Sequence, residues 1–206
     1  CREGALVVDM TTSSPKLAKR IYESGKKCGT KVLDAPVTGG DKGAREATLT
    51  IFAGGDKDAY EAALPYFHTM GRTVKYMGAA GSGQYAKLAN QIVIAGTMTG
   101  MCEALSFAKA CKLNLGDLLE AMSGGSANTW SLANYGPRIL KGDFEPGFFV
   151  KHYIKDMKLA EEAADELDMD LPALSLTREL YEELAEGGFE DKGTQSLYCL
   201  YDPEEE

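Results

Sequence analysis

The sequence has 206 residues, 44% of them hydrophobic, and a formal net charge of −9 with a pI near 4.9. This composition is typical of a globular protein with one or two domains. The negative charge opposes nucleic-acid backbones and anionic membranes, so we expect neither as a partner. The five cysteines are widely spaced and predict no disulfide framework, so a reducing cytoplasm is the favoured compartment. No group of residues has the spacing of metal ligands.

The first 80 residues alternate between apolar runs and helical patterns, which is typical of a mostly parallel sheet. A first strand is expected at 5–9. The helix that follows begins at Pro15, is capped by Ser13 or Ser14, and ends at Gly25 or Gly29. The remaining predicted elements of this part are strands at 31–37, 49–55 and 73–78 and a helix at 56–68 that is capped by Asp56.

A glycine-bearing stretch, TGGDKG at 38–43, follows the second predicted strand. We expect a flexible loop at the carboxyl end of that strand, which is where α/β sheets bind ligands. Thr38 offers a hydroxyl, and Gly39 and Gly40 offer backbone N–H groups, a set that suits a carboxylate. An ordinary surface turn has the same composition and is the alternative.

A long helix is predicted at 84–112, after a turn made by Gly81 and Gly83. Residues 88–102 carry no charge, so we expect a helix that is buried on every side. Helical spacing places Lys87, Asn90 and Gln91 on one face. Near a helix N-terminus, the dipole and partial burial disfavour the ammonium form, which makes Lys87 a candidate proton acceptor. The alternative is a lysine whose amine extends to water.

The rest of the chain is predicted to be helical, at 116–122, 150–167, 172–186 and 194–200. The segment from Ser123 to Trp130 is expected to be an interhelical turn followed by a tryptophan in the core, and the alternative is that it contributes to a substrate pocket. We therefore predict two domains, residues 1–80 and residues 81–206. The sheet of the first domain is short for a doubly wound fold, and no GxGxxG motif precedes it, so we expect a dinucleotide-binding domain that lacks its N-terminal part.

Four motifs occur in order along the chain: DMTTSSP at 9–15, DAPVTGG at 34–40, GSGQYAKLANQ at 81–91, and Phe149 followed by Lys155-Asp156. Together they resemble the β-hydroxyacid dehydrogenase family, which includes 3-hydroxyisobutyrate dehydrogenases and tartronate semialdehyde reductases. The resemblance covers nearly the whole chain. Thr38 stands where serine is more usual in this family, which keeps the hydroxyl and adds a methyl group.

The resemblance implies a truncated, Rossmann-like α/β sheet followed by an all-α domain of the 6-phosphogluconate dehydrogenase C-terminal type. It also implies a homodimer or homotetramer. The implied reaction interconverts a short β-hydroxy acid and the matching semialdehyde or keto acid, with NAD or NADP as cofactor and a small carboxylic acid as substrate. Without a phosphate-binding loop, a truncated chain is expected to be deficient in cofactor binding.

The resemblance also implies roles for individual residues. Lys87 would be the general acid/base. The substrate would be bound by Thr38, Gly39, Gly40, Lys87, Asn90 and Gln91, and the cofactor by Thr12, Phe149, Lys155 and Asp156. The residues by themselves allow structural alternatives, which are a helix cap for Thr12, a hydrophobic anchor for Phe149 and a solvated charged helix face for Lys155. The rival hypothesis is a non-catalytic helical module with a vestigial sheet, which dimerises or binds a small acid.

Overall fold

The structure is a computed structural model that describes residues 2–201. Its described residues form two compact units, one of residues 2–90 with 162–169 and the other of residues 91–161 with 170–201. The boundary between Asn90 and Gln91 falls inside one continuous helix, α4 (Ser82–Ala110).

The first unit is built on a five-stranded sheet within the described residues. The strands are β1 (Leu6–Asp9), β2 (Lys31–Asp34), β3 (Val37–Thr38), β4 (Leu49–Gly55) and β5 (Gly71–Gly78). β1 pairs with β2, and β4 pairs with β5, in parallel, whereas β2 and β3 both pair antiparallel with β4. The prediction of a mostly parallel sheet was therefore wrong at β4.

The antiparallel pairing follows from the short connection into β4. β2 and β3 lie in one line along β4, because Asp34 is opposite Gly54 and Val37 is opposite Ile51 in the same register. Between the two strands, the carbonyl of Pro36 accepts a hydrogen bond from the Phe52 N–H at 3.0 Å. A parallel crossover needs a dozen or more residues. The ten residues at 39–48 are too few for one, so the chain turns back on itself.

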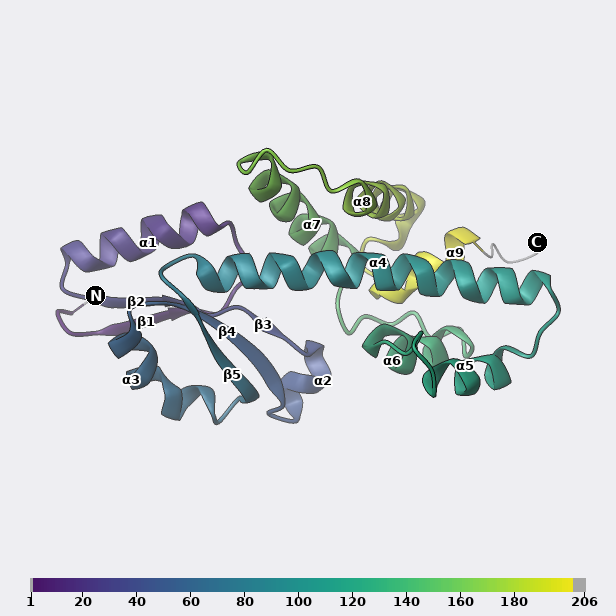
Figure 1. The fold of residues 1–206 in the computed structure, drawn as a ribbon, viewed down its shortest axis with the longest axis horizontal. Coiled ribbons are helices and arrows are strands. Elements are labelled where there is room, and N and C mark those ends of the chain that lie inside the picture. Colours follow the sequence, from purple (N-terminus) through teal and green to yellow (C-terminus); the bar gives the residue numbers. More distant parts are fainter. Residues whose placement is uncertain (1, 202–206) are drawn as a thin grey trace. The chain divides into compact units, whose positions relative to one another are not determined.

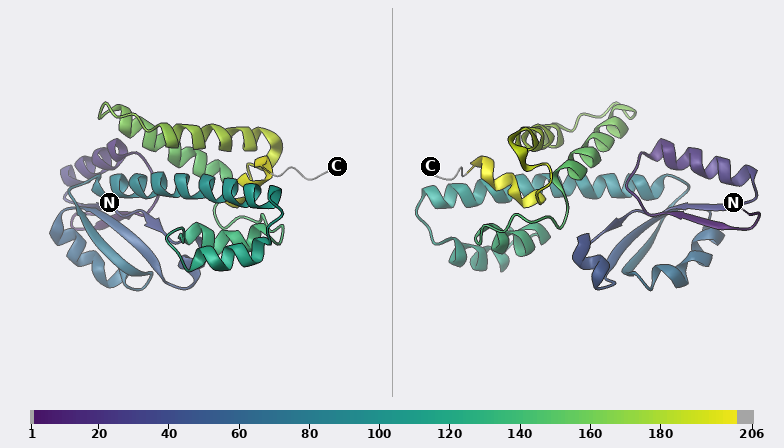
Figure 2. Two further views of the ribbon diagram at one scale, coloured as in Figure 1. Left: turned by 45° about the vertical axis from the view of Figure 1, so that its right-hand side comes forward. Right: turned by 180° about the vertical axis from the view of Figure 1, so that it is seen from behind.

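Two helices cover opposite sides of this sheet, as Figures 1 and 2 show. α1 (Pro15–Lys27) has Ser14 as its N-cap, with Oγ accepting from the Leu17 N–H at 3.1 Å, and it continues past Gly25. α3 (Lys57–Phe67) begins after Asp56, whose carboxylate accepts from the Tyr22 hydroxyl at 2.8 Å instead of capping the helix. The buried core of this unit comprises Leu33, Ala35, Leu49, Ile51, Ala53, Ala59, Ala63 and Phe67.

The segment predicted as a flexible glycine loop is a strand end followed by a short helix. Thr38 closes β3, and α2 (Gly40–Arg45) begins directly after Gly39. Gly39 and Gly40 have φ angles of +132° and +63°, which favour glycine. Composition alone did not distinguish this turn into a helix from a loop.

The regular elements of the second unit are all helical within its described residues, apart from one isolated bridge between Phe149 and Gly193. After α4, the elements are α5 (Leu115–Ser123), α6 (Trp130–Ile139), α7 (Val150–Asp165), α8 (Pro172–Leu184), a π turn (Ala185–Phe189), a 3₁₀ turn (Thr194–Leu197) and α9 (Tyr198–Tyr201). Figure 2 shows α7 and α8 side by side, and ion pairs of Arg178 with Glu161 (2.7 Å) and of Lys158 with Glu182 (2.8 Å) show that they are antiparallel.

Two tyrosines lie at the centre of the second unit. The rings of Tyr153 and Tyr181 meet edge to face at 5.1 Å, and both side chains are fully buried. Burial raises the pKa of both phenols well above the ordinary value. Their hydroxyls donate to the carbonyls of Gln91 and Thr194, so no buried hydroxyl is left unpaired at this pair.

Two predictions about burial were wrong. Trp130 is 55% exposed and lies edge-on against the Tyr135 ring at 5.4 Å. α4 is not buried on every side, since Val93 and Phe107 are 67% and 71% exposed. Apolar side chains favour burial, but they stay exposed on a helix face against which no other element packs.

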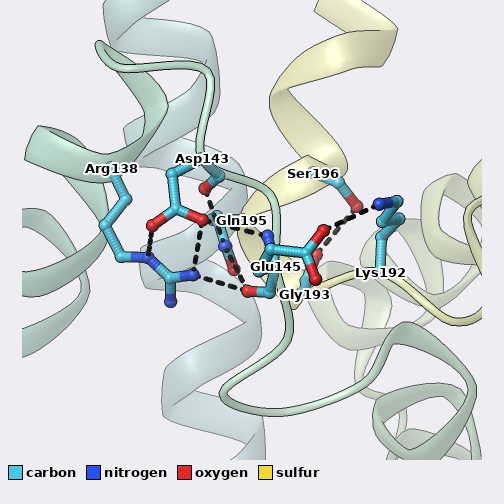
Figure 3. Close-up of polar contacts among 7 residues, drawn as sticks. All are labelled: Arg138, Asp143, Glu145, Lys192, Gly193, Gln195 and Ser196. Carbon is cyan, nitrogen blue, oxygen red and sulfur yellow. Dashed lines mark hydrogen bonds and ion pairs between the residues drawn. The ribbon is translucent and has the colours of Figure 1, made fainter.

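A polar cluster joins the segment before α7 to the segment after the π turn (Figure 3). Arg138 binds both carboxylate oxygens of Asp143, at 2.8 and 3.0 Å, and also donates to the Glu145 carbonyl. The buried Gln195 amide donates to the carbonyls of Asp143 and Glu145, both at 3.0 Å. Lys192 binds the Glu145 carboxylate at 2.9 Å. The cluster therefore fixes the connection that leads into α7.

The Arg138–Asp143 pair should make the second unit sensitive to acid. Hydrogen bonds from Arg138 lower the pKa of Asp143 to about 2 from its usual 3.8. A lowered folded-state pKa gives stability that is present above the unfolded-state pKa and is lost as pH falls. We expect the urea midpoint of the natural chain to fall between about pH 4 and pH 2. Asp143→Asn should be less stable at neutral pH and lose this part of the acid dependence; an unchanged acid dependence would contradict the assignment.

Candidate functional site

The start of α4 is held by a buried carboxylate from the sheet. Asp34, at the carboxyl end of β2, is 4% exposed and accepts from the backbone N–H groups of Gly81 (2.7 Å) and Gln84 (2.9 Å). Burial raises the pKa of Asp34, and these two N–H groups oppose the rise by stabilising the carboxylate. Asp34 therefore satisfies donors that a helix N-terminus otherwise leaves unpaired.

Two glycines allow α4 to approach the sheet closely. A Cβ at Gly83 would lie 2.4 Å from the Phe52 carbonyl oxygen and 2.5 Å from that of Asp34. A Cβ at Gly54 would lie 2.7 Å from the Gly83 nitrogen. The helix thus begins in direct backbone contact with β2 and β4, with no room for a side chain.

A buried glutamine ties α4 to the loop that follows β1. Gln84 is fully buried, and its Oε1 accepts from the Ser13 N–H at 3.0 Å while its Nε2 donates to the Thr11 carbonyl at 2.8 Å. Thr12, predicted to contact the cofactor, lies between these two anchored residues. This loop continues from the carboxyl end of β1, where Asp9 is in register with Asp34 of β2.

The predicted catalytic lysine is buried. Lys87 is 7% exposed, so its amine does not extend freely into water. It lies three residues after Gln84 and three before Asn90, on the same side of α4. The Asn90 Nδ2 atom is 3.4 Å from the Thr38 hydroxyl oxygen, a long hydrogen bond that places Asn90 at the end of β3. Thr38, Lys87, Asn90 and the Thr12 loop therefore all belong to the part of the first unit where strand ends meet α4.

Gly39 and Gly40, predicted to bind the substrate carboxylate, follow Thr38 at the turn into α2. The Gly39 carbonyl accepts from the Gly43 N–H at 2.9 Å and so begins the helix. A Cβ at Gly39 would lie 3.2 Å from the Leu49 side chain, so space as well as the φ angle favours glycine there. Neither residue carries a side chain that would obstruct an approaching ligand.

The remaining predicted site residues belong to the second unit. Gln91 is 1% exposed and donates from Nε2 to the Asp156 carboxylate at 2.7 Å. The Lys155 amine lies 2.9 Å from the other oxygen of that carboxylate, and its side chain is about half exposed. Phe149 precedes α7 and stacks edge-on with His152 at 5.4 Å. Gln91, Lys155 and Asp156 thus form one polar group, whose carboxylate is buried.

Sequence reasoning missed the roles of Asp34 and Gln84. The only available signal for Asp34 was an acidic residue at the end of an apolar strand. Gln84 lies in a motif that was recognised, but a glutamine near a helix start has no pattern that predicts full burial. Only tertiary contact showed that its amide meets a loop more than 70 residues earlier in the chain.

Within residues 2–201, no three His, Cys, Asp or Glu side chains in this part of the chain gather in a way that could hold a metal ion. Its helices include none with the length and apolar character needed to cross a membrane.

Comparison with known proteins identifies the family. Residues 81–201 match a family described as the NAD-binding domain of NADP-dependent 3-hydroxyisobutyrate dehydrogenase, and residues 1–78 match the NAD-binding domain of 6-phosphogluconate dehydrogenase. An uncharacterized oxidoreductase of Bacillus subtilis, YkwC, is 50% identical over 97% of this chain and 69% of its own length. The chain belongs to the β-hydroxyacid dehydrogenase family.

Two further β-hydroxyacid dehydrogenase relatives agree with this. The probable 3-hydroxyisobutyrate dehydrogenase-like 1 of Arabidopsis thaliana is 45% identical over 95% of this chain, which spans 58% of that protein. The Mycobacterium tuberculosis 3-hydroxyisobutyrate dehydrogenase, solved with L-serine, superposes with a TM-score of 0.89 at 29% identity over 98% of this chain and 72% of its own. The matches confirm the predicted Rossmann-like domain followed by a helical domain, and NAD or NADP as the cofactor of the family.

Proposed function

We propose that this chain carries the catalytic residues of an NAD(P)-dependent dehydrogenase that interconverts a short β-hydroxy acid and its semialdehyde or keto acid. The observation that carries the proposal is the buried Lys87, placed on α4 between Gln84, which holds the Thr12 loop, and Asn90, which reaches Thr38. The chain spans 58 to 69% of the two curated relatives above, so the activity is proposed for the whole natural protein.

Lys87 is proposed as the general acid/base. A buried amine near a helix N-terminus is less readily protonated than one in water, which suits a group that must gain and lose a proton near neutral pH. When the alcohol is oxidised, neutral Lys87 takes the hydroxyl proton. When the carbonyl compound is reduced, its ammonium form returns that proton to the oxygen.

Thr38, Gly39 and Gly40 are proposed to hold the substrate carboxylate. The Thr38 hydroxyl and the backbone N–H groups at this turn are donors suited to an anion, and the glycines leave the backbone accessible. Asn90, already near Thr38, can orient the reacting oxygen through its amide. Gln91 is also proposed to bind the substrate, and its hydrogen bond to the buried Asp156 carboxylate at 2.7 Å holds its amide in place.

The loop after β1 fits the nicotinamide end of the cofactor. It lies at the carboxyl end of a parallel strand, where α/β sheets bind dinucleotides. Ser13 Oγ is buried there with no hydrogen-bond partner among residues 2–201, and the Thr12 hydroxyl is adjacent. A hydroxyl can pair with a carboxamide, and we assign Thr12 to this role on the family resemblance. The cofactor, when bound, supplies the hydride acceptor or donor.

Phe149, Lys155 and Asp156 are proposed to serve the cofactor as well, following the family resemblance. Lys155 supplies an ammonium group, and the buried Asp156 holds it at 2.9 Å, so we assign Asp156 a positioning role.

We also propose functional domains at 1–80 and 81–206, supported by family matches at 1–78 and 81–201. The natural protein is proposed to be a homodimer or homotetramer in the cytoplasm.

The deciding experiment uses the natural protein that contains this sequence. It is incubated with NAD or NADP and a panel of acids, including 3-hydroxyisobutyrate and L-serine as β-hydroxy acids and lactate as an α-hydroxy control. We expect reduced nicotinamide to form with at least one β-hydroxy acid. If no acid in the panel supports reduction of either dinucleotide, the non-catalytic module with a vestigial sheet becomes the better description.

Replacing the Thr38 hydroxyl should weaken substrate binding selectively. We expect Thr38→Val to raise KM for the hydroxy acid about tenfold through loss of a hydrogen bond to a charged group, with the dinucleotide Kd unchanged. Thr30→Val is the matched control, because Thr30 Oγ1 is buried without a partner among the described residues. Equal KM values for the two variants would exclude Thr38 from the carboxylate site.

A further inference from the structure

Gln84 is the most completely buried polar side chain at the start of α4, and proton transfer through Lys87 does not use it. Its carboxamide makes two hydrogen bonds, one accepted from the Ser13 N–H and one donated to the Thr11 carbonyl. These two backbone groups lie on either side of Thr12. The single amide therefore closes the loop after β1 around the residue assigned to the cofactor.

The position of Gln84 is itself determined by the sheet. Its backbone N–H donates to Asp34 Oδ2 at 2.9 Å, while Asp34 Oδ1 binds the Gly81 N–H. Asp34 thus fixes the first turn of α4 on β2, and the Gln84 side chain fixes the Thr12 loop on that same turn. Lys87 follows three residues later on a continuous helix.

We propose that Gln84 is a positioning residue that sets the Thr12 loop relative to the Lys87 amine. The inference rests on the proposed function, because it assigns the purpose of the contact to Thr12 and Lys87. Hydride transfer and proton transfer require the cofactor at the Thr12 loop and the Lys87 amine to be aligned at the same time. A displacement of a reacting group by about 1 Å can lower the rate by about 10²-fold. A glutamine suits the task because one neutral group supplies both the donor and the acceptor.

The first test measures the loop itself, in the chain without cofactor. Gln84→Met keeps the side-chain length and removes both hydrogen bonds. We expect the Ser13 amide to exchange its proton with solvent at least about tenfold faster in this variant, measured by NMR. Thr177→Val is the control, because it removes a buried hydroxyl that pairs with Thr99 at 2.9 Å in the other unit. Exchange of Ser13 that is equal in both variants would overturn the proposal.

The second test measures catalysis by the natural protein. We expect Gln84→Met to lower kcat by about 10- to 100-fold, with a smaller change in KM for the acid, because alignment and not binding is lost. Thr177→Val should leave kcat within about twofold. A kcat for Gln84→Met that matches the control would contradict the positioning role even if the loop exchanges faster.

Gln84→Glu adds a readout that a loss of stability would not reproduce. An ionised carboxylate at this position cannot donate to the Thr11 carbonyl, whereas the protonated acid has the same donor and acceptor as the amide. Burial and the carboxylate of Asp34, which accepts from the backbone N–H of residue 84, would raise the pKa of the introduced acid. In the reductive direction, we expect the rate of Gln84→Glu relative to the natural protein to rise as pH falls from 8 to about 5. A ratio that does not depend on pH would overturn the proposal.

The two proposals fail in different ways. If the natural protein shows no hydride transfer, or if Lys87→Ala leaves it unchanged, the proposed function fails whatever Gln84 does. If Lys87→Ala is inactive but Gln84→Met behaves like Thr177→Val, the function stands and the positioning role is refuted.

Discussion

Lys87→Ala should lower kcat by about 10²- to 10⁴-fold, the range expected when a general acid/base is removed. Alanine has no ionisable group that could exchange the proton in place of the amine, and the position is only 7% exposed. The Kd for the dinucleotide should remain unchanged, because Lys87 is assigned to the proton and not to the cofactor. Steady-state kinetics and dinucleotide titration by fluorescence measure the two quantities separately.

Two controls separate proton transfer from simple loss of charge. Lys87→Arg keeps the positive charge but cannot give up its proton near neutral pH, so we expect it to be as inactive as Lys87→Ala in the oxidative direction. A small primary amine added to Lys87→Ala should restore part of the rate. Full activity of Lys87→Ala would remove Lys87 from the chemistry and leave its burial as a packing feature.

Gly83→Ala should destabilise the first unit by at least about 3 kcal/mol, more than most single substitutions. The added methyl group would lie 2.4 and 2.5 Å from two backbone carbonyl oxygens, of Phe52 and Asp34, which cannot move without disturbing β4 and β2. Urea unfolding followed by circular dichroism measures the loss. We also expect kcat to fall in the natural protein, because α4 carries Lys87 and Asn90.

The matched control lies on the same helix. Gly96 has no heavy atom within 4 Å of its ideal Cβ, so Gly96→Ala should increase stability by about 0.5 to 1 kcal/mol through helix propensity. Opposite signs for the two substitutions would show that packing at Gly83, and not the general preference of a helix for alanine, decides the outcome. A loss below about 1 kcal/mol for Gly83→Ala would contradict the close contact.

Periodicity and capping signals determined much of the local structure. β4 occupies the predicted 49–55, and α4 extends from Ser82 to Ala110, close to the predicted 84–112. Ser14 caps α1 as one of the two predicted candidates. These features depend on near neighbours in the chain, such as a hydroxyl facing an N–H three residues away or apolar side chains at regular spacing. Local rules therefore suffice for them.

The direction of β4 and the surroundings of Lys87 were decided only in three dimensions. Parallel and antiparallel strands have the same local pattern, and only the short connection through α2 makes the chain return along β3. By itself, the sequence determined that a lysine follows a glycine turn at the start of a long helix, in which residues 88–102 carry no charge. The tertiary structure decided that Gln84 and Asp34 join that helix to β1 and β2, because a buried amide or carboxylate must find its partners wherever the fold brings them.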